Sequence, residues 1–221
     1  MNPIAIILGI LIIIVLYLLY TYLYPSNVVL SNSSSLSVAS SPITNFTNPS
    51  STRYTLGIWV YINSLPATES KIYSRETSNA KLSLSIDPAS GPTLLFKIKC
   101  GSNTESIVIT DNFPIQKWVC VLFSVDNSFV DAYIDGKLVI SKKLSNQPDT
   151  FPADSAISPI NLGSNIDGTV ARFTYWSKPI NPQEAYDFYM NGNGQSIMGS
   201  KYGANLNIIR DNIISTQIKL F

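Results

Sequence analysis

The sequence predicts an all-β sandwich with one short surface helix, preceded by a single transmembrane α-helix. Three observations carry this prediction. Residues 4–24 contain no charged side chain. Apolar and polar residues alternate with period two through most of 53–176, which indicates strands with one buried face. Residues 181–184 read Asn-Pro-Gln-Glu, a sequence typical of a helix start.

Residues 1–24 are predicted to be a transmembrane anchor. The uncharged run of 4–24 would span roughly 31 Å as a helix, close to the thickness of the hydrocarbon core of a bilayer. A cleaved secretory signal is the weaker alternative, because residues 1–3 carry no basic side chain and the apolar run is too long. A buried core helix would need a far larger protein around it. Amphipathic rings favour the headgroup level, so four tyrosines are expected at the membrane interface: Tyr17, Tyr20, Tyr22 and Tyr24.

Residues 25–52 form a polar, uncharged tract rich in Ser and Asn, typical of a stalk or linker. The tract also holds several apolar residues, so an edge strand added to the following domain is an open alternative. Asn32 and Asn45 match the N-glycosylation acceptor pattern, which matters only if this part of the chain faces a secretory lumen. The first charged residue is Arg53, so charge does not give the membrane topology.

Residues 53–192 are expected to form the sandwich. Strand patterns recur about every ten residues, separated by turn signals, and Asp135-Gly136 predicts a two-residue hairpin turn. The 15 basic and 14 acidic residues all lie after residue 52 and form no basic run, so nucleic acid is not an expected partner. Cys100 and Cys120 are too few for a disulfide framework; buried free thiols are favoured over a single bridge.

The one helix expected in this domain begins after Asn181, which can cap it together with Glu184, and ends near Asn191-Gly192. Its apolar stripe is Ala185, Phe188 and Tyr189. The stripe predicts a short helix that lies on the surface of the sandwich.

Several segments together resemble a known family: YTLGIWVYI, KIYSRET, KWVCVLFSVDNSFVDAYIDGKLV and INLGSNIDGTVARFTYWSKPINPQEAYDFYMNG. This succession, over about 53–192, is similar to the laminin-G and pentraxin-like branch of the concanavalin A-like jelly rolls. Trp118, the 133–137 hairpin and the 182–184 helix start hold the places that the family's motifs require. The resemblance implies a jelly-roll fold; it does not specify function, because this fold hosts lectins, hydrolases, adhesion modules and structural spacers.

No catalytic residue, metal site or cofactor is expected. The chain has no histidine, and its four glutamates lack the E-x-D-x-E spacing of the hydrolases that share the fold. Five aspartates in expected loops form no local ligand cluster for Ca²⁺, so they are interpreted as isolated turn residues: Asp111, Asp126, Asp149, Asp154 and Asp167. A glycan site stays open, although Trp59, Trp118 and Trp176 all lie in strands, where core packing is the commoner use.

Residues 193–221 are expected to supply a closing strand and a docking tail. The segment mixes apolar residues with Asn, Ser and Thr, and neither helical nor strand spacing fits throughout. The residues expected to dock a protein partner are Ile208, Ile209, Ile213, Ile214 and Phe221.

The favoured function is a non-catalytic, membrane-anchored structural protein that links a bilayer to a protein shell. The His-free, Ile- and Asn-rich composition and the anchor-plus-jelly-roll architecture resemble the minor capsid proteins of large DNA viruses with an internal membrane. Expected partners are then the lipid bilayer and capsid subunits, at the interface of the virion inner membrane and the capsid. The alternative is a lectin-like or adhesion module displayed on a cell surface or endomembrane.

Overall fold

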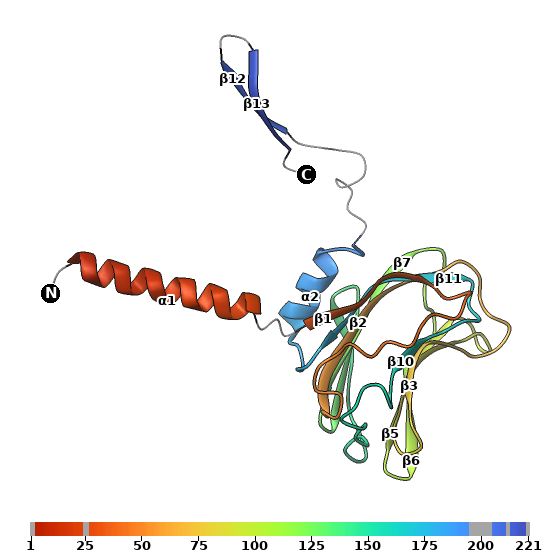
Figure 1. Ribbon diagram of the computed structural model, residues 1–221. Helices are drawn as coiled ribbons and strands as arrows, with labels where there is room; N and C mark the ends of the chain where they lie inside the picture. The colour runs from red at the N-terminus through yellow and green to blue at the C-terminus, as the bar shows by residue number, and fades with distance from the viewer. Residues whose placement is uncertain (1–2, 24–26, 195–204, 211–212, 220–221) are drawn as a thin grey trace.

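The computed structural model describes residues 3–23, 27–194, 205–210 and 213–219 (Figure 1). Helix α1 covers Pro3–Leu23, and its described side chains, from Leu8 to Leu19, are mostly exposed apolar groups. Within the described part of the chain, no helix meets the combined length and hydropathy of a membrane-spanning segment. The predicted segment is therefore helical, and its place in a membrane stays a prediction.

Two antiparallel sheets form the sandwich, as expected from the alternation. The six-stranded sheet has the order β1-β11-β2-β7-β8-β9, with the bounds Asn27–Ser35, Gly168–Trp176, Arg53–Ile62, Trp118–Asp126, Phe129–Ile134 and Lys137–Lys143. The five-stranded sheet has the order β10-β3-β4-β5-β6, with the bounds Ile160–Leu162, Ser70–Glu76, Lys81–Asp87, Thr93–Cys100 and Asn103–Thr110. Sequential strands mostly pair through short turns, while β1 and β10 join the sheets from distant parts of the chain.

The main core lies between the two sheets. Inward positions of β4 and β5 (Leu82, Leu84, Phe96) face inward positions of β2 and β7, and Phe96 stacks on Phe123 with ring centroids 4.3 Å apart. Asp135 and Gly136 have φ of 48° and 75°, so the predicted two-residue hairpin turn is confirmed. Cys100 and Cys120 are buried and free, as favoured from the sequence.

The polar tract 25–52 is not a free stalk over its described part. Residues 27–35 form β1, which pairs with β11 at the edge of the six-stranded sheet. The chain then crosses to the five-stranded sheet, where Ile43 forms a bridge with Ile160, and it buries Leu36 and Phe46 on the way. A few apolar residues at suitable positions therefore outweigh the polar composition of the tract and attach it to the domain.

Helix α2, Pro182–Met190, has the expected start. The Asn181 side chain accepts a hydrogen bond from the Glu184 backbone N–H, and the Glu184 carboxylate accepts one from the Asn181 backbone N–H. Ala185 and Phe188 are buried against the outer face of the six-stranded sheet. The predicted short surface helix is confirmed.

In the described residues of the C-terminal segment, the expected closing strand on the sandwich is not formed. Strands β12, Asn205–Arg210, and β13, Ile213–Lys219, pair with each other in a separate two-stranded sheet. Pairing between neighbours in sequence closes a far shorter loop than a return to the sandwich edge would. Phe221 lies outside the described residues.

The register also defines two opposite rims of the sandwich. β1 begins at Asn27 opposite Trp176 and ends at Ser35 opposite Thr169. We call the rim near the start of β1 the Phe129 rim; it holds the turns at 50–52, 77–80, 101–102, 127–128 and 177–180 and the loop 144–159, which carries Ile157. We call the other the Gly136 rim; it holds the loops at 63–69, 88–92, 111–117, 135–136 and 163–167.

Candidate functional site

The outer face of the six-stranded sheet is covered in part by α2. A second apolar cluster fills this contact, and its buried members are Trp59, Cys120, Leu122, Tyr133, Ala171, Trp176, Ile180, Ala185 and Phe188. Trp118 and Tyr189 pack against the cluster but stay partly exposed. The burial of Trp59 and Trp176 agrees with the core use expected for them, whereas Trp118 belongs to an accessible surface.

Four partly or well exposed rings continue from this cluster toward the Gly136 rim; we call Tyr61, Trp118, Tyr186 and Tyr189 the aromatic strip. Tyr61 and Trp118 are register partners on β2 and β7, with ring centroids 5.6 Å apart. Tyr189 stacks on the buried Trp59 at 5.7 Å, and Tyr186 lies 6.3 Å from Tyr189. Two rings lie on strands and two on α2, so regular secondary structure positions all four.

A groove of about 620 Å³ adjoins one end of the strip, and its lining residues are Ile109, Thr110, Ile134, Asp135, Lys137, Val139, Tyr186 and Tyr189. The groove owes its shape to Gly136. A Cβ at Gly136 would lie 3.1 Å from the Tyr186 Cα, so only a glycine lets α2 pack this closely on the hairpin turn. The glycine thereby brings Tyr186 next to Asp135 and Lys137.

Charged groups stand beside the rings. One carboxylate oxygen of Asp135, Oδ1, accepts a hydrogen bond from the Cys120 backbone N–H at 2.9 Å, which fixes the side chain. Its other oxygen, Oδ2, lies 3.9 Å from Nζ of the exposed Lys117. The strip therefore combines apolar ring faces with an anchored carboxylate acceptor and the ammonium donors of Lys117 and Lys137, a surface suited to a ligand that has an apolar face and hydroxyl edges.

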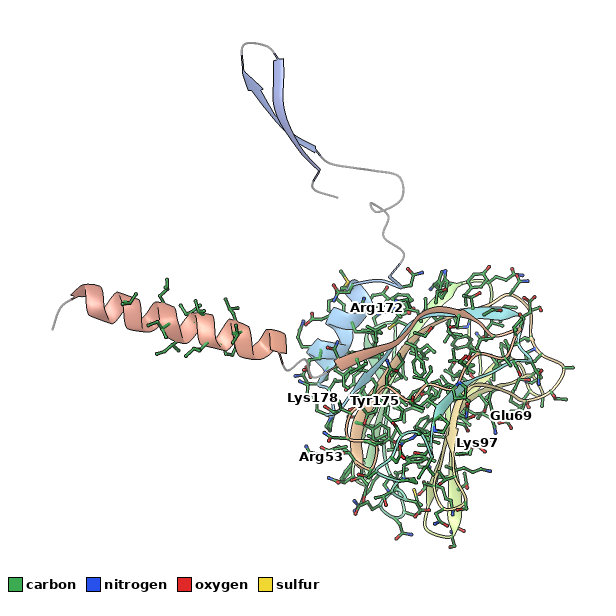
Figure 2. All side chains as sticks on the ribbon, viewed as in Figure 1. Arg53, Glu69, Lys97, Arg172, Tyr175 and Lys178 are labelled. Carbon is green, nitrogen blue, oxygen red and sulfur yellow. The ribbon has the colours of Figure 1, made fainter. Side chains whose placement is uncertain are left out.

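The outer face of the five-stranded sheet is open and polar (Figure 2, near the labelled Glu69 and Lys97). Glu69 accepts hydrogen bonds from Lys97 Nζ at 2.6 Å and from Ser85 Oγ at 2.7 Å. Partial burial raises the pKa of Glu69, but these hydrogen bonds outweigh it, so the pKa lies below its usual value. A depression of about 610 Å³ beside Glu69 is lined by residues 66–71, Ser74 and residues 162–165, none of which is aromatic. Since its charges pair with one another, this face is a weaker candidate than the aromatic strip.

The loop aspartates do not come together as a metal site. Asp167 accepts hydrogen bonds from the Asn63 amide at 2.7 Å and the Ser64 hydroxyl at 2.9 Å. Asp126 pairs with Arg53 at 2.8 Å, and Asp111 lies in the loop after β6. Asp149 and Asp154 share the loop between β9 and β10, where Asp149 pairs with Lys99 at 3.7 Å and Asp154 accepts a hydrogen bond from the Ala156 backbone N–H. Among the described residues, no group of three or more His, Cys, Asp or Glu side chains could hold a metal ion.

All four glutamates have basic or hydroxyl partners. Glu69 pairs with Lys97, Glu76 with Lys71, Glu105 with Lys142 and Glu184 with Lys178. Hydrogen bonds from Ser145 lower the pKa of Glu105, and those from Lys178 and Asn181 outweigh burial and lower the pKa of Glu184. A general acid at neutral pH needs a raised pKa, and the pKa values of Glu69, Glu105 and Glu184 are all lowered.

The other residues singled out in the sequence lie apart from the strip. Tyr17 is exposed on α1, Tyr20 and Tyr22 belong to the helical backbone of α1, and Tyr24 lies outside the described residues. Both acceptor asparagines are exposed, Asn32 on β1 and Asn45 in the crossing segment. The four isoleucines expected to dock a partner belong to β12 and β13: Ile208, Ile209, Ile213 and Ile214.

Sequence reasoning missed the strip. Tyr189 was expected in the apolar stripe of α2, Asp135 as a turn residue and Trp118 as core. The available signal was Tyr186, which the helical period places outside the apolar stripe on α2 although it is aromatic.

The concanavalin A-like lectin/glucanases superfamily (Laminin_G_3) matches residues 31–185. No curated protein matches the chain. Among solved structures, domain 4 of AbnA, a GH43 extracellular arabinanase from Geobacillus stearothermophilus, was determined in complex with arabinotriose. It is 23% identical, the match covers 63% of this chain and 68% of that one, and the TM-score is 0.52.

The ligand binding domain of botulinum neurotoxin serotype D, determined in complex with N-acetylneuraminic acid, is 16% identical over 73% of this chain and 42% of that one, with a TM-score of 0.59. The serotype G binding domain is 18% identical over 68% of this chain and 39% of that one, with a TM-score of 0.54. The matches thus span about two fifths of these toxin domains, and at such identities they show the fold alone. Because the superfamily match covers well over half of the sequence, the chain belongs to the concanavalin A-like lectin/glucanases superfamily.

Proposed function

We propose that this protein is a glycan-recognition domain that binds its ligand without catalysis and is held at a membrane by α1. The aromatic strip carries the proposal. Its four rings lie on regular secondary structure, and two of them, Tyr186 and Tyr189, line a groove of about 620 Å³ together with the anchored Asp135 carboxylate and Lys137. A sugar ring has an apolar face that stacks on an aromatic side chain and hydroxyls that bond to charged groups. The arabinotriose and N-acetylneuraminic acid complexes of two proteins with the same fold add support.

The test is binding of the full chain, purified in detergent, to a glycan array, followed by calorimetry with the best ligand. We expect Trp118→Ala and Tyr186→Ala each to weaken binding about tenfold, which corresponds to about 1.4 kcal/mol. Phe129→Ala is the matched control, because Phe129 is an aromatic side chain on the opposite rim whose exposed fraction, 52%, is close to the 45% of Tyr186. A blank array, or equal losses in all three variants, would reject the aromatic strip as a glycan site.

The absence of catalysis needs its own test. Every Glu carboxylate has an ion-pair partner, and a glycosidase of the usual kind needs one carboxyl group that is protonated near neutral pH. We expect the bound glycan to be recovered intact after prolonged incubation with the protein. If chromatography detects shorter glycans with the natural protein and none with the Glu69→Gln variant, this part of the proposal is rejected.

Membrane anchoring is supported by the uncharged run 4–24 and by the exposed apolar side chains of α1, which have no protein core to bury them. Figure 1 shows α1 projecting away from the sandwich. We expect the protein to stay with vesicles in alkaline carbonate and its mature form to retain α1. Release by carbonate, or a mature N-terminus after Tyr24, would contradict the anchor.

A second candidate function is assembly between a bilayer and a protein shell, such as a viral capsid. The observation that favours it is the pair β12–β13, which no other strand of the described chain joins, because a two-stranded sheet is marginal in water and gains stability on a partner. Cross-linking on the native particle should then join Lys219 or a neighbouring residue of 193–221 to other proteins. Cross-links confined to this chain would favour glycan recognition alone.

A further inference from the structure

The link between α1 and the sandwich is short. α1 ends at Leu23 and β1 begins at Asn27, so four residue steps join them and can span at most about 14 Å. β1 enters its sheet opposite Trp176, at the Phe129 rim. If α1 is embedded in a bilayer, as the proposed function requires, the start of β1 at the Phe129 rim is held within about 14 Å of the end of α1, and the Gly136 rim lies at the far end of the strands.

The Phe129 rim has exposed apolar side chains that the fold does not use. Phe129, at the start of β8, is 52% exposed, and Ile157, in the loop before β10, is 66% exposed. Large apolar side chains in these positions gain free energy when they leave water for the interfacial region of a membrane. They lie at the rim that the short link places at the bilayer.

Basic groups lie on the same side of the sandwich as Phe129. Lys143 is exposed and is the register partner of Phe129 on β9. Arg53 and Lys178 lie on the side of the sandwich from which α1 projects, opposite Glu69 and Lys97 (Figure 2). Arg53 and Lys178 form ion pairs with Asp126 and Glu184, whereas no ion pair joins Lys143 to another described residue. An aromatic ring beside an unpaired ammonium matches the apolar and phosphate layers of a membrane surface.

We infer that the Phe129 rim rests on the bilayer, with Phe129 and Ile157 in the headgroup region and Lys143 against lipid phosphates. The inference rests on the proposed anchoring by α1. It gives the domain a fixed orientation on the membrane, in which the aromatic strip near the Gly136 rim is presented outward. A long flexible stalk would let the domain take every orientation relative to the membrane. A link of four residue steps, together with membrane contacts on one rim, restricts the domain to one orientation.

The experiment places an environment-sensitive fluorophore on Phe129→Cys, Ile157→Cys or Ile115→Cys in the full chain, reconstituted in vesicles of phosphatidylcholine and phosphatidylserine. Ile115 is an exposed apolar residue on the Gly136 rim and serves as the matched control. Both native thiols are buried, and burial raises the pKa of Cys100 to about 11, so labelling favours the new cysteine. All three substitutions are at exposed positions, where the fold tolerates change.

We expect a blue shift of emission and quenching by nitroxide-labelled lipids at positions 129 and 157, and neither effect at position 115. Equal signals at all three positions, in protein that floats with the vesicles, would overturn the contact of the rim while leaving the anchor intact. Protein that does not float with the vesicles would overturn the anchor and the orientation together. Stronger quenching at position 115 would show that the opposite rim faces the membrane.

Discussion

The guanidinium carbon of Arg75 lies 3.9 Å from the ring centroid of Phe151, and the ring of Phe46 lies on it at 4.8 Å. The side chain is almost fully buried and donates hydrogen bonds to Pro49 and Ser158. Burial lowers the pKa of Arg75 to about 10, which leaves it charged at neutral pH. One strand residue thus holds both the crossing segment 36–52 and the loop before β10 on the sandwich.

Replacing Arg75 by Met should lower the free energy of unfolding by about 2–4 kcal/mol, because the carbonyls of Pro49 and Ser158 lose their donor in a buried site. Urea unfolding followed by tryptophan fluorescence, with the full chain in detergent, measures the change. Arg53→Met is the control, since Arg53 is exposed and its ion pair with Asp126 contributes little. Similar midpoints for the two variants would mean that Arg75 does not fasten these segments.

The sandwich could be predicted because its strands alternate with period two and because Asp135-Gly136 fits only a few turn types. The sequence left open whether β1 forms a strand or belongs to a linker. Its sequence NVVLSNSSS carries little alternation, and it becomes a strand because the edge of β11 offers unpaired backbone groups. The composition of 25–52 therefore indicated a polar linker but did not predict that residues 27–35 pair with the sandwich as a strand.

The aromatic strip could not be read from the sequence for a different reason. Its members come from β2, β7 and α2, and their closeness depends on where α2 crosses the sheet. That crossing is fixed by Gly136 and by the bulge in β11 at Arg172, which has φ of 49° and donates a hydrogen bond to the Gly192 carbonyl. Neither the approach of α2 to Gly136 nor the hydrogen bond from Arg172 to Gly192 follows from a sequence motif.

Stability should vary little between pH 5 and 8 and fall below about pH 4.5. The chain has no histidine, and the pKa values of Glu69, Glu105 and Glu184 lie below their usual value of 4.5 in the folded state. A carboxyl group with a lowered pKa stabilises the fold above its unfolded pKa, and this contribution is lost as the pH falls through the folded value. Urea midpoints across the pH range measure the effect.

Glu105→Gln should flatten this acid dependence, because Glu105 accepts hydrogen bonds from both the backbone and the side chain of Ser145. Glu76→Gln is the comparison, because Glu76 pairs with Lys71 and Lys81 at the surface, where ion pairs contribute little, so its substitution should leave the slope nearly unchanged. A protein that gains stability on acidification would show that other groups control its response to pH.

Asn181→Ala should lower the free energy of unfolding by about 1 kcal/mol by removing the cap of α2. Gln183→Ala is the control in the same turn, because Gln183 is exposed and bonds only to the side chain of Asp187. Since α2 carries Tyr186 and Tyr189, the cap variant should also weaken glycan binding. Equal stability of the two variants would contradict the role of the cap.

Gly136→Ala tests the close approach of α2 to the hairpin turn. Gly136 has φ of +75°, and an added Cβ would lie 3.1 Å from both the Tyr186 Cα and the Tyr189 Cβ. Gly101→Ala is the matched control, because Gly101 also has a positive φ of +66° but has open space around its missing Cβ. Both substitutions introduce backbone strain of about 1 kcal/mol, and only the one at Gly136 also pushes α2 away. We therefore expect both variants to lose some stability in urea unfolding and only Gly136→Ala to lose glycan affinity. Equal affinities would mean that the position of α2 does not control the binding surface, and the aromatic strip would then have to act through Tyr61 and Trp118 alone.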